Sequence, residues 1–329
     1  MGTRGYILWK VLQALLTLAF VMTFNFFLFR MIPGDPSEAL LQGTYEFDPS
    51  NVEAVTHDLG LDKPLPQQFL VYLQDALTLN FGQSYALQGE DVKQAISSRM
   101  WPSALLIATS TIASAAIGLL IGIYSGWRRG SRFDLGSQWF TMFVYSMPEF
   151  WFAIIVLMAF AQGVGPFPSL FPAGGYSTPG SDLTGLAHAA DVLRHLALPW
   201  FVLTVAFLGE YALIMRNALI GVTGDHFVTT ARAKGLREKQ VMWRHAVPNA
   251  LLPTFTIVML SIGFVFGGAI AIEYVFSYPG LGLLTVQAIG AKDFPLLQGL
   301  FLLFSAVVLL ANLIADVLYV YLDPRIRSA

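Results

Sequence analysis

Apolar residues in this chain gather into six long runs rather than the narrow stripes typical of a water-facing helix. A helix needs about 20 apolar residues to cross roughly 30 Å of hydrocarbon at about 1.5 Å per residue. The runs lie at about 7–29, 104–124, 135–161, 196–219, 251–272 and 296–321. The pattern therefore predicts an all-α membrane protein with about six transmembrane helices.

The composition argues against a soluble domain and against several kinds of catalytic or metal site. Of the 329 residues, 55% are hydrophobic and only 12% are charged, which is too little charge to cover a soluble domain of this length. The absence of cysteine excludes disulfides, thiolate metal sites and cysteine nucleophiles. The five histidines form neither an HxH nor an HExxH pattern, so we expect no metal site.

The first run resembles a secretory signal because Arg4 and Lys10 stand at its start. It is too long for a signal core, and no small-x-small cleavage site follows it. We interpret it as a retained membrane anchor.

Basic residues indicate the orientation. With the N-terminus in the cytoplasm, the inner segments carry most of the 19 Lys and Arg residues, whereas the outer segment after the first span is rich in Asp and Glu. The inner set is Arg4, Lys10, Arg128, Arg129, Arg132, Arg216, Arg232, Lys234, Arg237, Lys239, Arg244, Arg325 and Arg327. We expect both termini to be cytoplasmic.

This topology predicts three parts. They are a cytoplasmic N-terminus with the first transmembrane helix at 1–30, a small extracytoplasmic segment at 31–103, and a five-helix core at 104–329. We expect a helix near 67–77 and an irregular outer loop at 162–195, which is rich in Gly, Pro and Ser. A short outer loop at 277–295 begins with a turn signature. A basic inner loop spans 220–250.

The inner loop has the pattern of a short capped helix. Thr223 or Asp225 is suited to accept the free N–H groups at its start. Gly235 supplies a left-handed residue at its end, and Leu236 is placed for the accompanying apolar contact. We expect a second short helix at about 237–247, ending at Pro248, so that the two form a projecting knob. A solvated basic loop, or one that contacts anionic lipid, would explain the same charges.

The inner loop and five further segments, in order along the chain, resemble a known family. Thr229-Thr230-Ala231-x-x-x-Gly235, followed by His245-x-Val247-Pro248, resembles the "EAA" cytoplasmic loop of permeases in binding-protein-dependent ABC importers, and is closest to the dipeptide/oligopeptide branch. Thr229, His245 and Val247 depart from the usual Glu, Ile and Leu. The supporting stretches are 33–36, 59–66, 148–151, 267–282 and 312–327.

The resemblance implies a type I permease that opens alternately to the two sides of a prokaryotic inner membrane. It implies a second homologous permease subunit, two ATP-binding-cassette ATPase subunits and an extracytoplasmic substrate-binding protein. The chain has no Gly-x4-Gly-Lys-Ser/Thr phosphate loop, so ATP and Mg²⁺ are expected on the partners, with no catalytic residue and no cofactor on this chain. The residues expected to contact the ATPase are Phe227, Thr230, Ala231, Arg232, Ala233, Lys234, Gly235 and Leu236.

Ionisable residues inside spans are costly and are therefore candidates for function. Glu149, Glu210 with its neighbour Tyr211, and Glu273 are candidates for the substrate path, or alternatively for contacts between helices. For Asp316, on one helix face with Asn312, we favour a structural role. The close-packing pattern Gly118-x-x-x-Gly122 fits contact either within the chain or with a second permease.

The substrate expected from the resemblance is a peptide, with nickel, glutathione or an oligosaccharide as alternatives. A more distant alternative is a proton-coupled secondary transporter. Such a protein usually has more spans and inverted repeats, and here it is supported only by Glu149 and Glu210.

Overall fold

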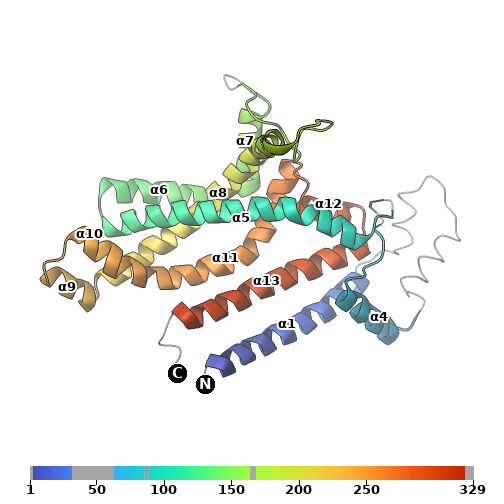
Figure 1. Cartoon of the computed structure of the whole chain (residues 1–329), viewed down its shortest axis with the longest axis horizontal. Coiled ribbons are helices and arrows are strands. Elements are labelled where there is room, and N and C mark those ends of the chain that lie inside the picture. Colours follow the sequence, from blue (N-terminus) through green and yellow to red (C-terminus); the bar gives the residue numbers. More distant parts are fainter. Residues whose placement is uncertain (1–2, 32–62, 85, 88, 164–167, 323–329) are drawn as a thin grey trace.

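The computed structural model describes residues 3–31, 63–84, 86–87, 89–163 and 168–322 (Figure 1). The described part is almost entirely helical, and its one β-bridge joins Gln83 to Asp91. The helices are α1 (Thr3–Met31), α4 (Leu65–Thr78), α5 (Val92–Trp127), α6 (Arg132–Ser146), α7 (Glu149–Phe160), α8 (Gly185–Thr223), α9 (His226–Ala233), α10 (Glu238–Val241), a π-helical turn (Met242–Ala246), α11 (Val247–Val275), α12 (Leu281–Gly290) and α13 (Phe294–Leu322).

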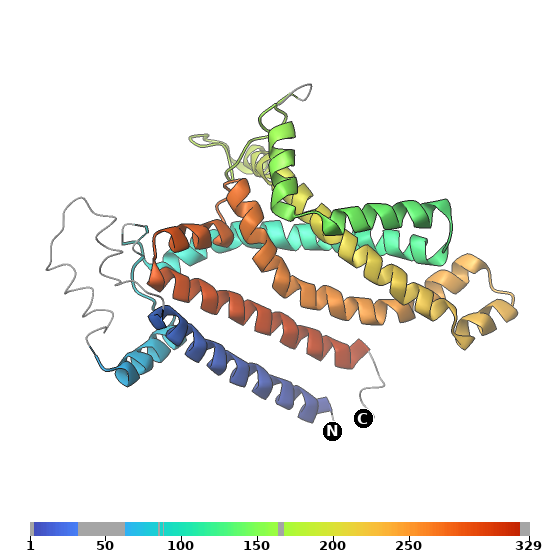
Figure 2. The same ribbon diagram turned by 180° about the vertical axis from the view of Figure 1, so that it is seen from behind.

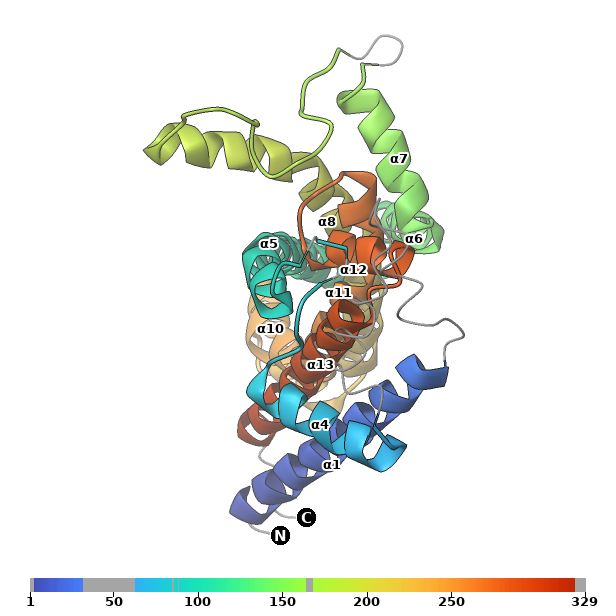
Figure 3. The ribbon, with the colours of Figure 1, turned by 90° about the vertical axis from the view of Figure 1, so that its right-hand side faces the viewer.

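The long helices form an elongated bundle. α5, α8 and α11 pack together at its centre, while α1 lies alongside α13 on one flank (Figures 1 and 2). α13 ends beside the start of α1, on the side of the molecule that carries α9 and α10. The opposite end carries α4, α12 and the beginning of α5 (Figure 3).

The all-helical membrane architecture is confirmed. Within the described residues, α1, α5, α8 and α13 are long and apolar enough to cross a bilayer, and α6 with α7 would make a fifth crossing. The remaining predicted span, 251–272, coincides with α11.

The third predicted span is broken. α6 and α7 meet at 98°, so the apolar run over 135–161 forms two helices rather than one continuous helix. Pro148 explains the corner because a proline disfavours helical geometry in the residue before it. Met147 is accordingly extended, at φ −83° and ψ 127°, and α7 begins immediately after the proline.

Several helices extend beyond the predicted spans. α5 starts at Val92, inside the segment assigned to the extracytoplasmic part, and the Asp91 side chain caps it by accepting a 3.1 Å hydrogen bond from the Gln94 N–H. The outer loop expected at 162–195 is irregular only as far as Thr184, because α8 begins at Gly185. The turn after α11 leads into the short helix α12. The helix expected at 67–77 is confirmed as α4, whereas residues 32–62 lie outside the described residues.

Small residues explain the tight contact between α5 and α8. A Cβ atom at Gly118 would lie 2.8 Å from the Leu208 carbonyl oxygen, and one at Gly122 would lie 2.6 Å from the Ala212 carbonyl oxygen. Gly126 approaches Arg216 in the same way one turn further on. The glycine pattern therefore packs helices within this chain, which decides between the two alternatives left open by the sequence.

Candidate coupling site and the buried carboxylates

The first helix of the predicted knob begins later than expected. α8 continues through Thr223, whose hydroxyl donates to the Ile220 carbonyl oxygen at 2.8 Å, so this residue does not cap the next helix. Asp225 occupies the N-cap position of α9, but its side chain makes no capping hydrogen bond. The predicted side-chain cap is therefore wrong at both positions, and α9 follows α8 after a tight turn.

The end of α9 has the predicted geometry. The Leu236 N–H donates to the Ala231 carbonyl oxygen at 3.4 Å, and the Gly235 N–H donates to that of Arg232 at 2.9 Å. This pair of bonds forms a Schellman motif, which requires a left-handed residue at the position that Gly235 occupies with φ +75°. Gly235 thus fixes where the chain leaves α9.

The second predicted helix does not end at Pro248. The backbone runs from α10 through the π-helical turn into α11 without leaving helical geometry. Proline has no N–H and its ring collides with the carbonyl four residues earlier in an α-helix. The wider turn, in which the Val247 N–H bonds to the Met242 carbonyl oxygen, relieves that collision. The knob is therefore joined directly to a membrane helix.

We define the knob as residues 224–246. Its inward face is apolar: Val228, Ala231, Val241 and Met242 are buried, and they pack in one cluster with residues of α5 and α8. The outward face is open. Phe227 and Leu236 are 38% and 37% exposed, and Thr230, Arg232, Ala233 and Lys234 are exposed as well. Of the predicted contact residues, Ala231 alone has its side chain turned inward.

Arg232 links the two halves of the knob. Its guanidinium donates to Glu238 from Nε at 2.9 Å and from Nη2 at 3.3 Å, and it lies 5.3 Å from the centre of the Trp127 ring. Exposed ion pairs of this kind contribute little stability on their own. The bidentate geometry nevertheless holds α9 and α10 in one orientation.

Beneath the knob lies an ion pair that sequence reasoning missed. Arg216 of α8 donates to both carboxylate oxygens of Asp134 in α6, at 2.6 and 3.0 Å. The Ser125 hydroxyl, the Gly130 N–H and the Gln138 side-chain amide also donate to this carboxylate, which is 1% exposed. The charge pattern of the sequence identifies Arg216 only as an inner basic residue. Its position inside an apolar run was the signal that it needed a buried partner.

Two further carboxylates are buried at the other end of the bundle. Glu273, which is fully buried, accepts hydrogen bonds from the Ser103 hydroxyl at 2.5 Å and from the N–H groups of Gly282 and Leu283 at 2.7 and 3.2 Å. The two N–H groups belong to the first turn of α12. Glu273 thus fixes α12 to α11 and, through Ser103, to α5.

Asp293 plays the same part for α13. It accepts from the Leu296 N–H at 3.1 Å, from the Ser84 hydroxyl at 2.6 Å and from the Ala86 N–H at 2.9 Å, and it too is fully buried. One carboxylate therefore caps a helix and fastens the loop that precedes α5. The sequence signal for this cap is an Asp directly before the helix start. Asp293 stands three residues ahead of Leu296, the residue whose N–H it accepts from.

The other path candidates are scattered. Glu149 is the first residue of α7 and Glu210 lies in α8; both are half-buried, and among the described residues neither forms an ion pair or hydrogen bond. Tyr211 is fully buried. Asp316 pairs with Lys10 of α1 at 3.1 Å, beside a cavity of about 130 Å³ that Asn312 also lines. This contact between α1 and α13 fits the structural role favoured for Asp316.

Comparison with known proteins covers nearly the whole chain. Residues 118–328 match the family described as "Binding-protein-dependent transport system inner membrane component", and residues 4–100 match its N-terminal companion family. The di/tripeptide transport system permease protein of Pseudomonas aeruginosa is 36% identical over 320 residues, covering 93% of this chain and 94% of that protein.

Two more relatives extend the range of named substrates. The oligopeptide transport system permease protein of Bacillus subtilis is 31% identical, and the match covers 98% of this chain and 99% of that protein. The glutathione transport system permease protein of Pectobacterium atrosepticum is 34% identical with the same coverage. The chain therefore belongs to the inner membrane components of binding-protein-dependent transport systems, and is a multi-pass permease of the ABC importer type.

Proposed function

We propose that this permease forms the membrane path of an ATP-driven peptide importer, and that the knob is the part which receives force from a partner ATPase. The observation that carries the proposal is the two-faced construction of the knob. Its inward face is locked into the apolar core between α5 and α8, while its outward face presents Phe227, Leu236 and Lys234 to a partner. An outward apolar and basic surface on a rigid base suits docking into a cleft.

Two rigid connections carry displacement from the knob into the bundle. One is α8, which precedes α9 by a two-residue turn and is fixed to α6 by the Arg216–Asp134 pair. The other is the uninterrupted helical path from α10 into α11. A push on the knob would thus move α6, α8 and α11 together, as alternating access by rigid-body motion requires.

The partners follow from the family and from what this chain lacks. With no phosphate loop in its sequence, the chain relies on two ATPase subunits to bind ATP and Mg²⁺, and it acts as a non-catalytic permease subunit. A second homologous permease would complete the path, and an extracytoplasmic binding protein would deliver substrate. The knob and both termini then lie in the cytoplasm.

Peptide is the substrate that the relatives favour, since two of the three described above are named for peptide transport and the third for glutathione, which is itself a peptide derivative. Glu149 and Glu210 are suited to meet the amino group of a peptide, because each is partly exposed and has no cationic partner among the described residues. Tyr211 and Glu273 are buried within the chain, so a role on the path would require these side chains to become accessible during transport.

Coupling is tested by Gly235→Asp in proteoliposomes that contain the second permease, the ATPase subunits and the binding protein. We expect ATP-dependent peptide uptake to fall at least tenfold, because Asp adopts φ +75° only at a cost and places a negative charge among basic residues. Gly221→Asp is the matched control. Gly221 is exposed in the last turn of α8, next to the knob, and a Cβ atom there meets nothing within 4 Å. Full uptake by the Gly235 variant would refute the coupling role.

The substrate is tested separately by identifying the ligand that the cognate binding protein retains on purification. A short peptide would support the proposal, whereas a nickel complex or an oligosaccharide would contradict the peptide assignment but leave the coupling role intact. Uptake driven by a proton gradient without any ATPase would contradict both.

A further inference from the structure

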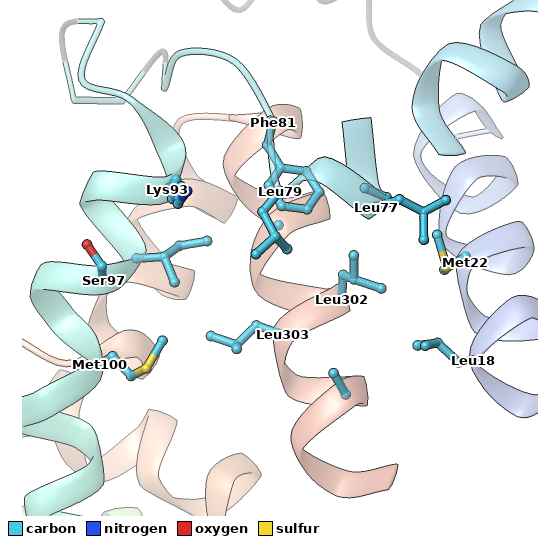
Figure 4. A pocket seen from close by; sticks show the side chains of 14 residues that line it. Leu18, Met22, Leu77, Leu79, Phe81, Lys93, Ser97, Met100, Leu302 and Leu303 are labelled. Atoms are coloured by element: carbon cyan, nitrogen blue, oxygen red, sulfur yellow. The ribbon is translucent and has the colours of Figure 1, made fainter. Parts of the chain in front are cut away.

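A cavity of about 390 Å³ opens between α1, α4, α5 and α13, at the end of the bundle where α5 begins (Figure 4). Its wall is almost entirely apolar. Met22 of α1, Leu302 and Leu303 of α13, and Met100 of α5 surround it, and α4 closes it from one side. A space of this size matches the pockets that enclose small organic ligands.

Large apolar side chains of α4 and α5 line the cavity without being covered. Leu77 is 77% exposed, Leu79 is 53% exposed and Met100 is 42% exposed. Leu79 closes α4 as its left-handed C-cap, with φ +56°, and its N–H donates to the Ala76 carbonyl oxygen at 3.4 Å. The Leu79 side chain lies beside Phe81 within the group that surrounds the cavity (Figure 4). Exposed apolar side chains around an apolar cavity point to an apolar occupant.

Polar groups are confined to one end of the cavity. Lys93 and Ser97 lie one turn apart near the start of α5, and both are exposed. Met100 follows seven residues after Lys93, about 10 Å further along the helix. Within the described residues Lys93 has no ion-pair partner. The lining therefore carries one cationic group, Lys93, near the start of α5, while most of the other lining side chains are apolar.

We propose that this cavity binds a phospholipid with an anionic headgroup, with one acyl chain between α1 and α13 and the phosphate facing Lys93. An apolar space of this kind does not retain water, and an acyl chain restores the dispersion contacts that an empty space lacks. The apolar wall gives no preference among lipids, because all have similar tails. Lys93 supplies the preference by attracting negative charge. The site depends on the membrane placement of α1, α5 and α13, and not on which substrate is carried.

The test compares phosphatidylglycerol with phosphatidylethanolamine of identical acyl chains, by native mass spectrometry of the chain purified in its assembled complex. We expect an adduct that favours phosphatidylglycerol. Lys93→Gln should reduce that preference about fivefold, which is the ratio corresponding to about 1 kcal/mol per lysine at a charged surface. Lys292→Gln, at the same end of the molecule but outside the cavity, is the matched control and should leave the preference unchanged.

A second pair of variants tests the interior. Ala306→Phe fills the cavity and should remove the adduct with either lipid, whereas Ala311→Phe on the same helix should retain it. Equal adduct in the Ala306 variant and in the original protein would overturn the proposal, as would an unchanged preference in the Lys93 variant.

A third measurement excludes a protein occupant. Because the chain contains no cysteine, Leu77→Cys introduces a single thiol at the cavity. Efficient cross-linking of this thiol to another permease subunit, or to a second cysteine placed in residues 32–62, would also overturn the proposal. Labelling by a lipid-soluble maleimide without either cross-link supports it.

Discussion

The two ends of the bundle bury carboxylates by different means. At the end with the knob, Asp134 is paired with the guanidinium of Arg216. At the other end, Glu273 and Asp293 are held by serine hydroxyls and by N–H groups of helix first turns, with no cation bonded to either in the described structure. All three carboxylates are at most 1% exposed.

An arginine partner and a helix N-terminus join a buried carboxylate to different parts of the fold. A helix N-terminus carries roughly half a positive charge and offers free N–H groups, so it stabilises an anion without a second charged side chain. Such a contact fixes the start of a neighbouring helix. An arginine reaches across from the middle of a helix, so Arg216 ties α8 to α6 side by side near the knob. The outer contacts set where helices begin, and the inner contact makes two helices move together.

Arg216→Met gives the largest expected effect. It leaves Asp134 buried without its cation, which costs about 3 kcal/mol of unfolding free energy, at the lower end of values for buried pairs because Arg216 is partly exposed. Reversible denaturation in mixed micelles measures it. Arg129→Met, an exposed residue of the same end, should change stability little. The double variant Asp134→Asn with Arg216→Met removes both charges and keeps an acceptor for the Gly130 N–H, so it should recover part of the loss, and a double variant as unstable as the single one would contradict the pairing.

Asp293→Asn is expected to rank second, at about 2 kcal/mol of unfolding free energy. Both carboxylate oxygens accept from N–H groups, one from Leu296 and the other from Ala86. An amide group has one acceptor only, so one buried N–H loses its partner. Hydrogen exchange should locate the loss either at the start of α13 or in the loop around Ala86. Unchanged protection at both places would show that the structure assigns these bonds wrongly.

Gly235→Ala should cost about 1 kcal/mol, because the methyl group meets nothing within 4 Å and only the left-handed backbone is penalised. Gly235→Asn should cost less, since asparagine tolerates this geometry better than alanine does. Local hydrogen exchange of the Leu236 amide measures both. If the two variants were equally destabilised, a cause other than backbone geometry would be acting.

Glu273→Gln is expected to have the smallest effect, about 0.5 kcal/mol. One carboxylate oxygen accepts from both N–H groups while the other meets only the Ser103 hydroxyl. A glutamine therefore keeps its carbonyl on α12 and donates to Ser103, losing only the attraction of charge to the helix dipole. Thermal unfolding of Glu273→Gln and of Asp293→Asn measures the loss of stability at each of the two carboxylates. A Glu273→Gln loss larger than that of Asp293→Asn would refute this distinction.

Helix placement was largely predictable from the sequence because long apolar runs have few alternatives in a membrane. The knob's end was predictable at Gly235, where one residue type suits one backbone geometry. Pro148 and Pro248 show the limit. Each proline signals that an ordinary α-helix is disturbed, but one produced a corner and the other a π-helical turn inside a continuous helix. Proline removes one backbone N–H in both places, and the flanking sequence does not distinguish the two outcomes.

The buried carboxylates show a second limit. Glu273 was singled out because a charge near a span attracts attention, yet its partners are backbone N–H groups, which every residue possesses and no pattern reveals. Asp134 and Arg216 are separated by 82 positions in the chain, and nothing local indicates that they meet. Substrate-path residues stay a prediction for the same reason, because a path is formed by surfaces that lie far apart in the sequence.

The corner between α6 and α7 limits where lipid is able to lie. Twelve residues of α7 rise only about 18 Å, so that helix alone does not cross the hydrocarbon. At the corner Tyr145 is 61% exposed and Phe150 is 53% exposed, while the regular backbone ladder is interrupted between them. Acyl chains offer no partner for an interrupted ladder. The corner is therefore better suited to contact with water or with another polypeptide than to contact with acyl chains alone.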